Sequence, residues 1–375
     1  MAASDAATSA PSTRINALDL MRGYLIMVII SVHLAYYPSL LGAFDGRGQL
    51  WVSEAEGFFF ISGLLIGIIR RRDIERSGFM TAAVKVLKRG LRLYLTGAVL
   101  TILYLCWGRW MIGISPDSVK GGLDTSSSVL PLAWSIITLK YSYGWSDFLI
   151  FYAGFLFVTP IVLWLLLKRL WWVVLSATLG LWLWRWNGGY GPYNSFLQWQ
   201  VYFFLGTLIG YYWHTLGAAL ARLPGGWQRA VKLGAVIVTV MMAVGGLLAV
   251  FGPQNSSSSL FAWIHAVNAS TFYNRMLTDG RDGLLRPIVL LVTFAGAFTL
   301  VRRYEHKIMH YAGWLLLPFG RNSLYVYILG GLALFTIPFF AHAGSFWLNS
   351  ALEVGTITVI WLAVKHKVLF KIIPR

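Results

Sequence analysis

The chain contains a succession of apolar stretches, each about 20 residues long, separated by more polar connections, of which 107–146 and 252–283 are long. A helix of about 20 apolar residues is long enough to cross the hydrocarbon core of a bilayer. Inside that core the backbone amide and carbonyl groups find no water, so a spanning segment must pair them internally, as an α-helix does. The pattern therefore predicts an all-α fold, a polytopic bundle of membrane helices.

About ten such spans can be placed along the chain. Residues 1–13 come before them, are small and polar, and are expected to form a disordered tail ahead of a single integral-membrane domain over 14–375. The first span is longer than a signal-peptide core and carries charged residues, which favours a retained helix. The predicted spans cover residues 18–37, 50–69, 86–106, 147–167, 170–186, 196–214, 231–251, 284–301, 322–341 and 346–364.

The composition excludes several other classes of protein. Charged residues make up 12% of the chain, whereas about 25% is usual for a soluble domain. A single cysteine, Cys106, cannot build a disulfide scaffold. The net charge of +17 does not indicate nucleic-acid binding, because the basic residues lie in short tracts between apolar spans and form no polar basic domain.

The basic tracts also predict how the chain is oriented. If the N-terminus is cytoplasmic, most of the 31 Lys and Arg residues fall on the cytoplasmic side of the predicted spans. Cytoplasmic loops are enriched in these residues. We therefore expect both termini to be cytoplasmic, which agrees with an even number of spans.

Three ionisable residues lie within the first span: Asp19, Arg22 and His33. An ionisable group inside a membrane costs about 3 kcal/mol or more unless it faces a cavity or a partner. Eleven helical steps separate Arg22 from His33, which places both on nearly one face, about 16 Å apart along the axis. Asp19 precedes Arg22 by three residues and is close enough to pair with it. In one interpretation, Arg22 and His33 mark the two ends of a passage through the protein. In the other, Asp19 and Arg22 anchor the helix at the membrane surface, and His33 forms a hydrogen bond to a neighbouring helix.

The second span begins with acidic residues. Glu56 enters from the outer side at about the depth of His33. A carboxylate near an imidazole can orient the ring and stabilise its protonated form. The alternative is an acid that favours the positive end of the helix dipole.

Arginines stand at the predicted cytoplasmic ends of two further spans. Arg89 and Arg92 are three residues apart at the start of the third span, and Arg321 precedes the ninth. Guanidinium groups suit phosphates, so an anion site is one interpretation. Membrane anchoring is the other, and we prefer it for Lys85 and Lys88. The sequence has no metal-ligand spacing, phosphate-binding loop or nucleophile elbow, so no metal is expected.

Taken in order, these stretches resemble the OpgC family of membrane acyltransferases, within the wider acyltransferase-3 superfamily. Arg22 and His33 match the Arg-x10-His spacing of that superfamily, and RGLR (89–92) matches its Arg-x-x-Arg pattern. The ILGG stretch after SLYVY departs from relatives that often carry a histidine there. Further segments that resemble the family are EGFFFISGLLIG (56–67), SDFLIFYAGFLFVTP (146–160), NSFLQWQVYFFLGTLIG (194–210) and GRNSLYVYILG (320–330).

The resemblance implies O-acyl transfer from a cytoplasmic acyl-CoA to a glucan outside the membrane. The name-giving activity of the family is the succinylation of osmoregulated periplasmic glucans, so succinyl-CoA is the first co-substrate to consider and acetyl-CoA the second. No permanently bound cofactor is implied. The implied location is the bacterial inner membrane. A glycan or small-molecule transporter or flippase is the alternative, although the sequence shows no internal repeat.

Roles for individual residues follow from the same resemblance. His33 would act as general base on a sugar hydroxyl or carry the acyl group transiently, and Glu56 would hold its ring. The acyl chain, the acceptor hydroxyl and the oligomeric state stay open. The candidate substrate-binding residues are Arg22, Arg89, Arg92, Arg321, Asp19 and Ser62.

Overall fold

The computed structural model describes residues 15–373, apart from 49–50, 52, 113–127, 139, 142, 186–191, 254–258 and 271–282. Every regular element in this part of the chain is a helix, and it contains no strand. The all-α prediction is therefore confirmed. The predicted tail, 1–13, lies outside the described residues.

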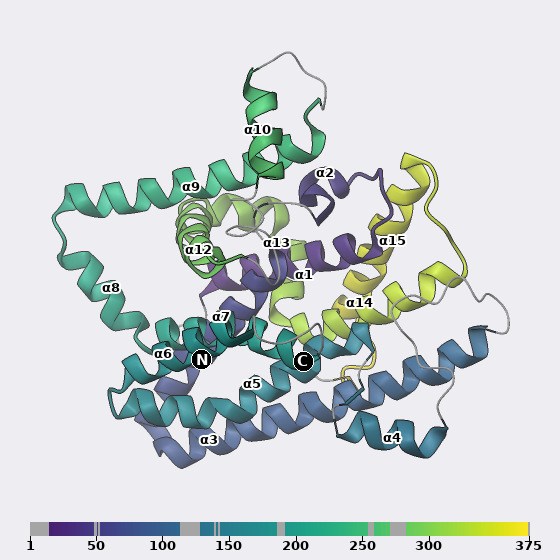
Figure 1. Ribbon diagram of the computed structural model, residues 1–375, viewed down its shortest axis with the longest axis horizontal. Coiled ribbons are helices and arrows are strands. Elements are labelled where there is room, and N and C mark those ends of the chain that lie inside the picture. The colour runs from purple at the N-terminus through teal and green to yellow at the C-terminus, as the bar shows by residue number, and fades with distance from the viewer. Residues whose placement is uncertain are drawn as a thin grey trace, which may run out of the picture.

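The helices are arranged as Figure 1 shows. They are α1 (Asn16–Leu34), α2 (Gly42–Asp45), η1 (Gly46–Gly48), α3 (Glu54–Ile112), α4 (Val129–Ile137), α5 (Gly144–Leu167), α6 (Trp171–Trp184), α7 (Pro192–Tyr211), α8 (Trp213–Arg222), α9 (Gly225–Phe251), α10 (Ser259–Ala269), α12 (Arg286–Arg303), α13 (Glu305–Arg321), α14 (Ser323–Thr336), η4 (Ile337–Phe339) and α15 (Phe346–Lys365).

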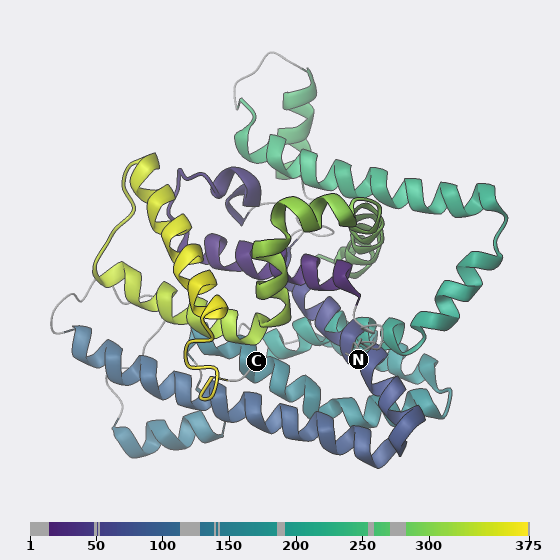
Figure 2. The same cartoon turned by 180° about the vertical axis from the view of Figure 1, so that it is seen from behind.

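Each predicted span overlaps a helix. The second and third spans both lie on α3, which changes direction sharply at Gly78 (Figure 2). Gly78 has φ 82° and ψ 163°, a conformation that glycine adopts readily because it lacks a Cβ atom. Of the helices in the described residues, five are long and apolar enough to cross a membrane, or six if the bent pair α12 and α13 forms one span. The number of ten spans and the cytoplasmic termini stay predictions.

Helix α1 occupies the middle of the molecule (Figures 1 and 2). It contacts α3, α12, α13 and α14, so the ionisable residues of the first span lie among several neighbouring helices. Helices α3, α5 and α7 pack together on one side of it. On the other side α9 packs on α12, and α8 with the start of α9 extends outward at one edge.

Helix α13 lies between two of the predicted spans, 284–301 and 322–341, where the sequence analysis predicts no helix. It bends by 95° from α12 and packs directly against α1. A Cβ atom on Gly320 would lie 1.8 Å from the carbonyl oxygen of Asp19, so the two backbones touch here. Charged residues and Pro318 interrupt the apolar run in this segment, which is why it does not show a 20-residue signal.

Helices α3 and α7 also cross with their backbones in contact. Each carries two glycines four residues apart, Gly63 and Gly67 on α3 and Gly206 and Gly210 on α7. A Cβ atom on Gly206 would lie 2.1 Å from the carbonyl oxygen of Phe60. Small residues at this spacing let membrane helices approach closely enough for backbone packing.

Replacing Gly206 with leucine is expected to destabilise the fold by about 3 kcal/mol, because overpacking at this site can be relieved only by moving backbone. Thermal unfolding of the detergent-solubilised protein measures the change. Gly180→Leu in α6 is the matched control, since a Cβ atom there meets no atom within 4 Å. Equal melting temperatures for the two variants would contradict the close crossing.

Candidate functional site

His33 stands in the last turn of α1, and its solvent-accessible ring lines a cavity of about 180 Å³. Five helices form the walls: α1, α3, α5, α7 and α14. The cavity is mixed in character, with aromatic rings and three titratable side chains, His33, Asp147 and Tyr327. Its lining residues are Ile29, Ile30, His33, Ala55, Gly144, Trp145, Asp147, Phe148, Phe151, Trp199, Tyr327, Gly331 and Leu334.

The hydrogen bonding of His33 determines which ring nitrogen can act as a base. Nδ1 lies 2.8 Å from the carbonyl oxygen of Ile29. A carbonyl can only accept, so this bond places a proton on Nδ1, and the neutral ring then keeps its lone pair on Nε2. The edge of the ring also meets Trp145, with centroids 5.5 Å apart. The structure therefore presents Nε2 as the atom able to take a proton or attack a carbonyl carbon.

Asp147 is a residue that the sequence analysis missed. It lies in the first turn of α5 and lines the same cavity as His33. Tyr327 of α14 lines the cavity too, and its hydroxyl donates to the carbonyl oxygen of Trp145 at 3.2 Å. Asp147 could have been found in the sequence as an acidic residue at the edge of an apolar run, which is the pattern that singled out Asp19.

Glu56 was predicted to hold the ring of His33, but in the structure it binds Tyr202 and Arg286. Its Oε1 accepts hydrogen bonds from the Tyr202 hydroxyl at 2.7 Å and from Nε of Arg286 at 2.9 Å, and its Oε2 lies 2.8 Å from Nη2 of Arg286. In the described part of the chain no hydrogen bond joins Glu56 to His33. The reason is rotational: Ala55 lines the His33 cavity, and the next residue on a helix points about 100° away.

Arg286 was counted in the sequence only as one of the outer basic residues. In the structure it begins α12, and its side chain is as deeply buried as that of Glu56, each 2% exposed. A third contact runs from its Nη1 to the carbonyl oxygen of Trp51, 2.6 Å away. Arg286 thus joins one carboxylate by a hydrogen bond to Oε1 and an ion-pair contact to Oε2, and charge-assisted contacts of this kind are strong. The pair therefore ties α12 to the start of α3.

The other end of α1 carries a polar cluster. Arg22 donates through Nη2 to the hydroxyl of Ser323, and its guanidinium carbon lies 5.6 Å from the centre of the Phe58 ring. Asp19 pairs with Arg321, with 3.7 Å between Oδ2 and Nε. This corrects the predicted pairing of Asp19 with Arg22. The cluster forms because the junction of α13 and α14 meets the beginning of α1.

The other residues predicted to bind substrate, Arg89, Arg92 and Ser62, do not line one common site. Arg89 is half-buried and lies over the Tyr152 ring of α5, 5.8 Å from its centre. Arg92 is exposed, because three helical steps rotate it about 60° away from Arg89. Ser62 is buried within α3 and does not line the His33 cavity.

A set of aromatic rings lies between Arg22 and the His33 cavity. The Phe58 ring under Arg22 meets Phe148 edge-on, with centroids 5.5 Å apart. Phe148 in turn packs against Tyr327 at 5.2 Å, and both of these rings line the cavity. A series of aromatic contacts therefore links Arg22 to the lining of the His33 cavity.

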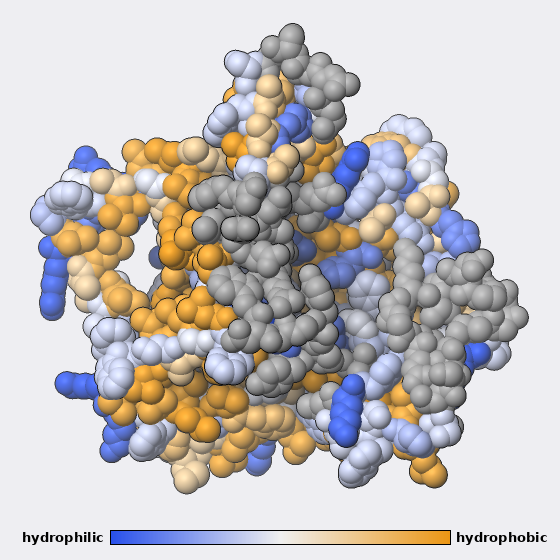
Figure 3. Space-filling view, viewed as in Figure 1, coloured by the Kyte–Doolittle hydropathy of each residue, from blue (hydrophilic) through white to orange (hydrophobic). Residues whose placement is uncertain are grey.

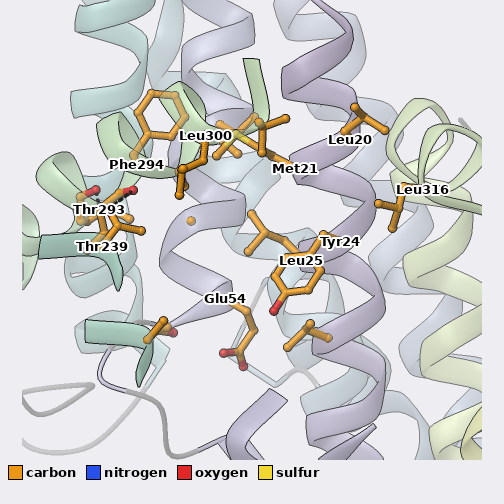
Figure 4. Close-up of a pocket in the computed structure, with 18 of the residues that line it drawn as sticks. Leu20, Met21, Tyr24, Leu25, Glu54, Thr239, Thr293, Phe294, Leu300 and Leu316 are labelled. Atoms are coloured by element: carbon orange, nitrogen blue, oxygen red, sulfur yellow. Dashed lines mark hydrogen bonds between the residues drawn. The ribbon is translucent and has the colours of Figure 1, made fainter. Parts of the chain in front are cut away.

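A second cavity, of about 430 Å³, lies against another face of α1, among α3, α9, α12 and α13. Its walls are mainly apolar, with Leu25 and Phe294 among them (Figure 4). Tyr24 and Glu54 are directed toward the same end of it (Figure 4). This cavity does not reach His33, so we do not place the chemistry there.

Comparison with known families was made over the whole chain. The model of a family described as OpgC protein matches residues 14–372. The chain belongs to the OpgC family. An OpgC protein is a transferase that modifies glucans, and the match includes both Arg22 and the complete His33 cavity. No curated protein and no solved structure matches the chain.

Proposed function

We propose that this OpgC-family protein is an integral-membrane O-acyltransferase. It moves an acyl group, most simply succinyl, from a cytoplasmic acyl-CoA to a hydroxyl of a glucan on the outer side. The observation that carries the proposal is His33, whose Nε2 is left as acceptor in a cavity lined by Phe148, the ring that packs against Phe58 beside Arg22. The wider acyltransferase-3 relationship belongs to the same proposal.

The proposed setting is the bacterial inner membrane, with about ten spans and both termini cytoplasmic. Long apolar helices support it, and so does the hydrophobic surface that covers much of the molecule (Figure 3). In this orientation Arg22 lies near the cytoplasmic side, and His33 lies about 16 Å further along α1, toward the outer side. The active centre would therefore receive its two substrates from opposite faces of the bilayer.

Arginines bind the phosphates of the donor in this proposal. Arg22 and Arg321 lie near the start of α1, whereas Arg89 lies apart from them, over the Tyr152 ring of α5. Guanidinium forks match phosphate oxygens better than ammonium groups do. Asp19 holds Arg321 in place. The exposed Arg92 can contact those phosphates of the donor that lie at the protein surface. The thioester arm then passes the rings of Phe58 and Phe148, which suit a largely apolar chain.

Nε2 of His33 takes the proton of the attacking sugar hydroxyl as its oxygen bonds to the thioester carbonyl carbon. The carbon–sulfur bond then breaks, and the thiolate that leaves recovers the proton from the imidazolium, giving an ester and free CoA. In the second route Nε2 itself receives the acyl group before the sugar does. Asp147 shares the cavity, and its carboxylate can stabilise the imidazolium in either route.

The deciding experiment uses the full-length protein in proteoliposomes with radiolabelled succinyl-CoA or acetyl-CoA and a glucan. Label appearing on the glucan, with one CoA released for each ester, supports the transferase. Movement of unmodified glucan across the vesicle membrane without acyl donor, and no labelled glucan, would overturn it in favour of a transporter. Comparing the two donors identifies the acyl group.

Arg89→Ala is expected to raise the KM for acyl-CoA about tenfold, because a charged hydrogen bond to phosphate contributes roughly 1.5 kcal/mol or more. The KM for the glucan should change little. Steady-state kinetics with each substrate varied in turn gives both values. Lys88→Ala, which removes an exposed neighbouring charge, is the control. A larger effect on the glucan KM would refute the assignment.

A further inference from the structure

Helices α8 and α9 form an arm that stands away from the rest of the molecule (Figure 1). Between this arm and helices α7 and α12 lies a groove of about 710 Å³. Figure 3 shows the same place as an opening bordered by hydrophobic surface. The groove shares no lining residue with the His33 cavity, so its occupant is separate from the proposed acyl transfer.

One face of α8 is apolar and points into the groove. Trp213, Leu216, Gly217 and Leu220 all line it, at the helical spacing i, i+3, i+4 and i+7. No residue of α8 is buried by the rest of the protein. An amphipathic helix at the end of a membrane span normally rests its apolar face on lipid. Trp213 meets the Phe298 ring of α12, with centroids 5.5 Å apart, and the rest of this face, Leu216, Gly217 and Leu220, is open to an apolar occupant.

The groove also carries positive charge. Lys232, Arg302 and Arg303 line it together with the apolar residues. They flank the crossing of α9 and α12, where a Cβ atom on Gly296 would lie 2.3 Å from the carbonyl oxygen of Ala235. Lys232 is about 5 Å from that crossing along its helix, and Arg303 about 10 Å.

Acidic side chains do not balance these charges. Glu305 pairs with Arg302 at 3.6 Å, and no other acid forms a described ion pair with these three residues. A net positive charge therefore remains next to the apolar walls. The occupant must then be an amphiphile with a negative head and apolar chains.

We propose that the groove binds an anionic phospholipid. Its acyl chains lie along the apolar face of α8, and its phosphate meets Lys232 and Arg303. Basic pockets between membrane helices on the cytoplasmic side bind anionic lipid headgroups in this way. A zwitterionic lipid would fill the same space but would carry no net charge for the cations to bind.

Native mass spectrometry of the detergent-solubilised, full-length protein tests this, with phosphatidylglycerol and phosphatidylcholine of identical chains as probes. We expect phosphatidylglycerol to bind at least tenfold more tightly. The double variant K232Q/R303Q should weaken its binding about 30-fold, because each cation contributes about 1 kcal/mol. Equal affinity for the two lipids in the unmodified protein would overturn the proposal.

Two further variants separate the groove from general surface charge. R222Q/R229Q removes two positive charges from the same region, but neither residue lines the groove, so lipid binding should be retained. Gly217→Leu places a side chain in the groove without a clash, since a Cβ atom there meets nothing within 4 Å, and should reduce binding of both lipids. Unchanged lipid binding in Gly217→Leu, or equal losses in the two charge variants, would refute the site.

Discussion

His33→Ala is expected to lower kcat for acyl transfer to glucan by about 10²- to 10⁴-fold, the range for loss of a positioned acid–base group. The variant loses the only nitrogen base among the described residues that line the 180 Å³ cavity. The fold should persist, because the residue is exposed and the hydrogen bond described for its ring is to the carbonyl oxygen of Ile29 in its own helix. Initial rates with labelled donor measure the loss.

His342→Ala provides the matched control, since His342 is exposed outside the helices and does not line the cavity. It should keep full activity. Incubating the unmodified protein with labelled donor alone separates the two chemical routes, because only an acyl-histidine would retain label on the protein. A fully active His33→Ala variant would refute the mechanism.

Arg286→Ala is expected to destabilise the fold by about 3–5 kcal/mol, the usual cost of breaking a buried ion pair by removing one partner. The Glu56 carboxylate, 1% exposed, would then lack its counter-charge. The contact that fixes the Trp51 carbonyl would also be lost. Chemical unfolding in detergent, followed by tryptophan fluorescence, measures the change.

The double variant Glu56→Gln/Arg286→Met removes both charges and should recover a large part of that stability, as replaced buried pairs often do. This double-mutant cycle distinguishes a structural pair from a catalytic carboxylate. A catalytic Glu56 predicts the opposite pattern for Glu56→Gln alone, namely a loss of kcat with unchanged stability. That result would support the prediction from the sequence that Glu56 holds the ring of the catalytic His33.

The positions of the helices could be predicted because each long apolar run has few structures open to it in a bilayer. Helix α13 could not, because its apolar residues are divided by charges and Pro318, and it is the packing against α1 that orders it. The turn at Gly78 joins two predicted spans without a loop. The charges of residues 70–77 predict that the second span ends there, but they do not predict that the chain stays helical up to Gly78.

For the candidate site, the sequence predicts how far along its own helix each residue lies. It does not predict which residues of other helices that residue contacts. Arg22 and His33 share one helix, so their spacing alone relates them. Glu56 and Arg286 are 230 residues apart, and their contact depends on how α3 and α12 pack. Asp147 meets the His33 cavity for the same kind of reason. Single-helix geometry predicts which residues matter better than it predicts what they touch.

The close crossing of α3 and α7 has a consequence for substrate entry. A space of about 180 Å³ is smaller than the roughly 300–1,000 Å³ typical of ligand sites, so the His33 cavity must widen to hold thioester and sugar together. Two walls joined backbone to backbone through Gly63 and Gly206 cannot part without losing that packing. The opposite walls meet through side chains, with Phe148 of α5 against Tyr327 of α14. We therefore expect the substrates to enter the cavity between Phe148 and Tyr327, when these two rings rotate apart.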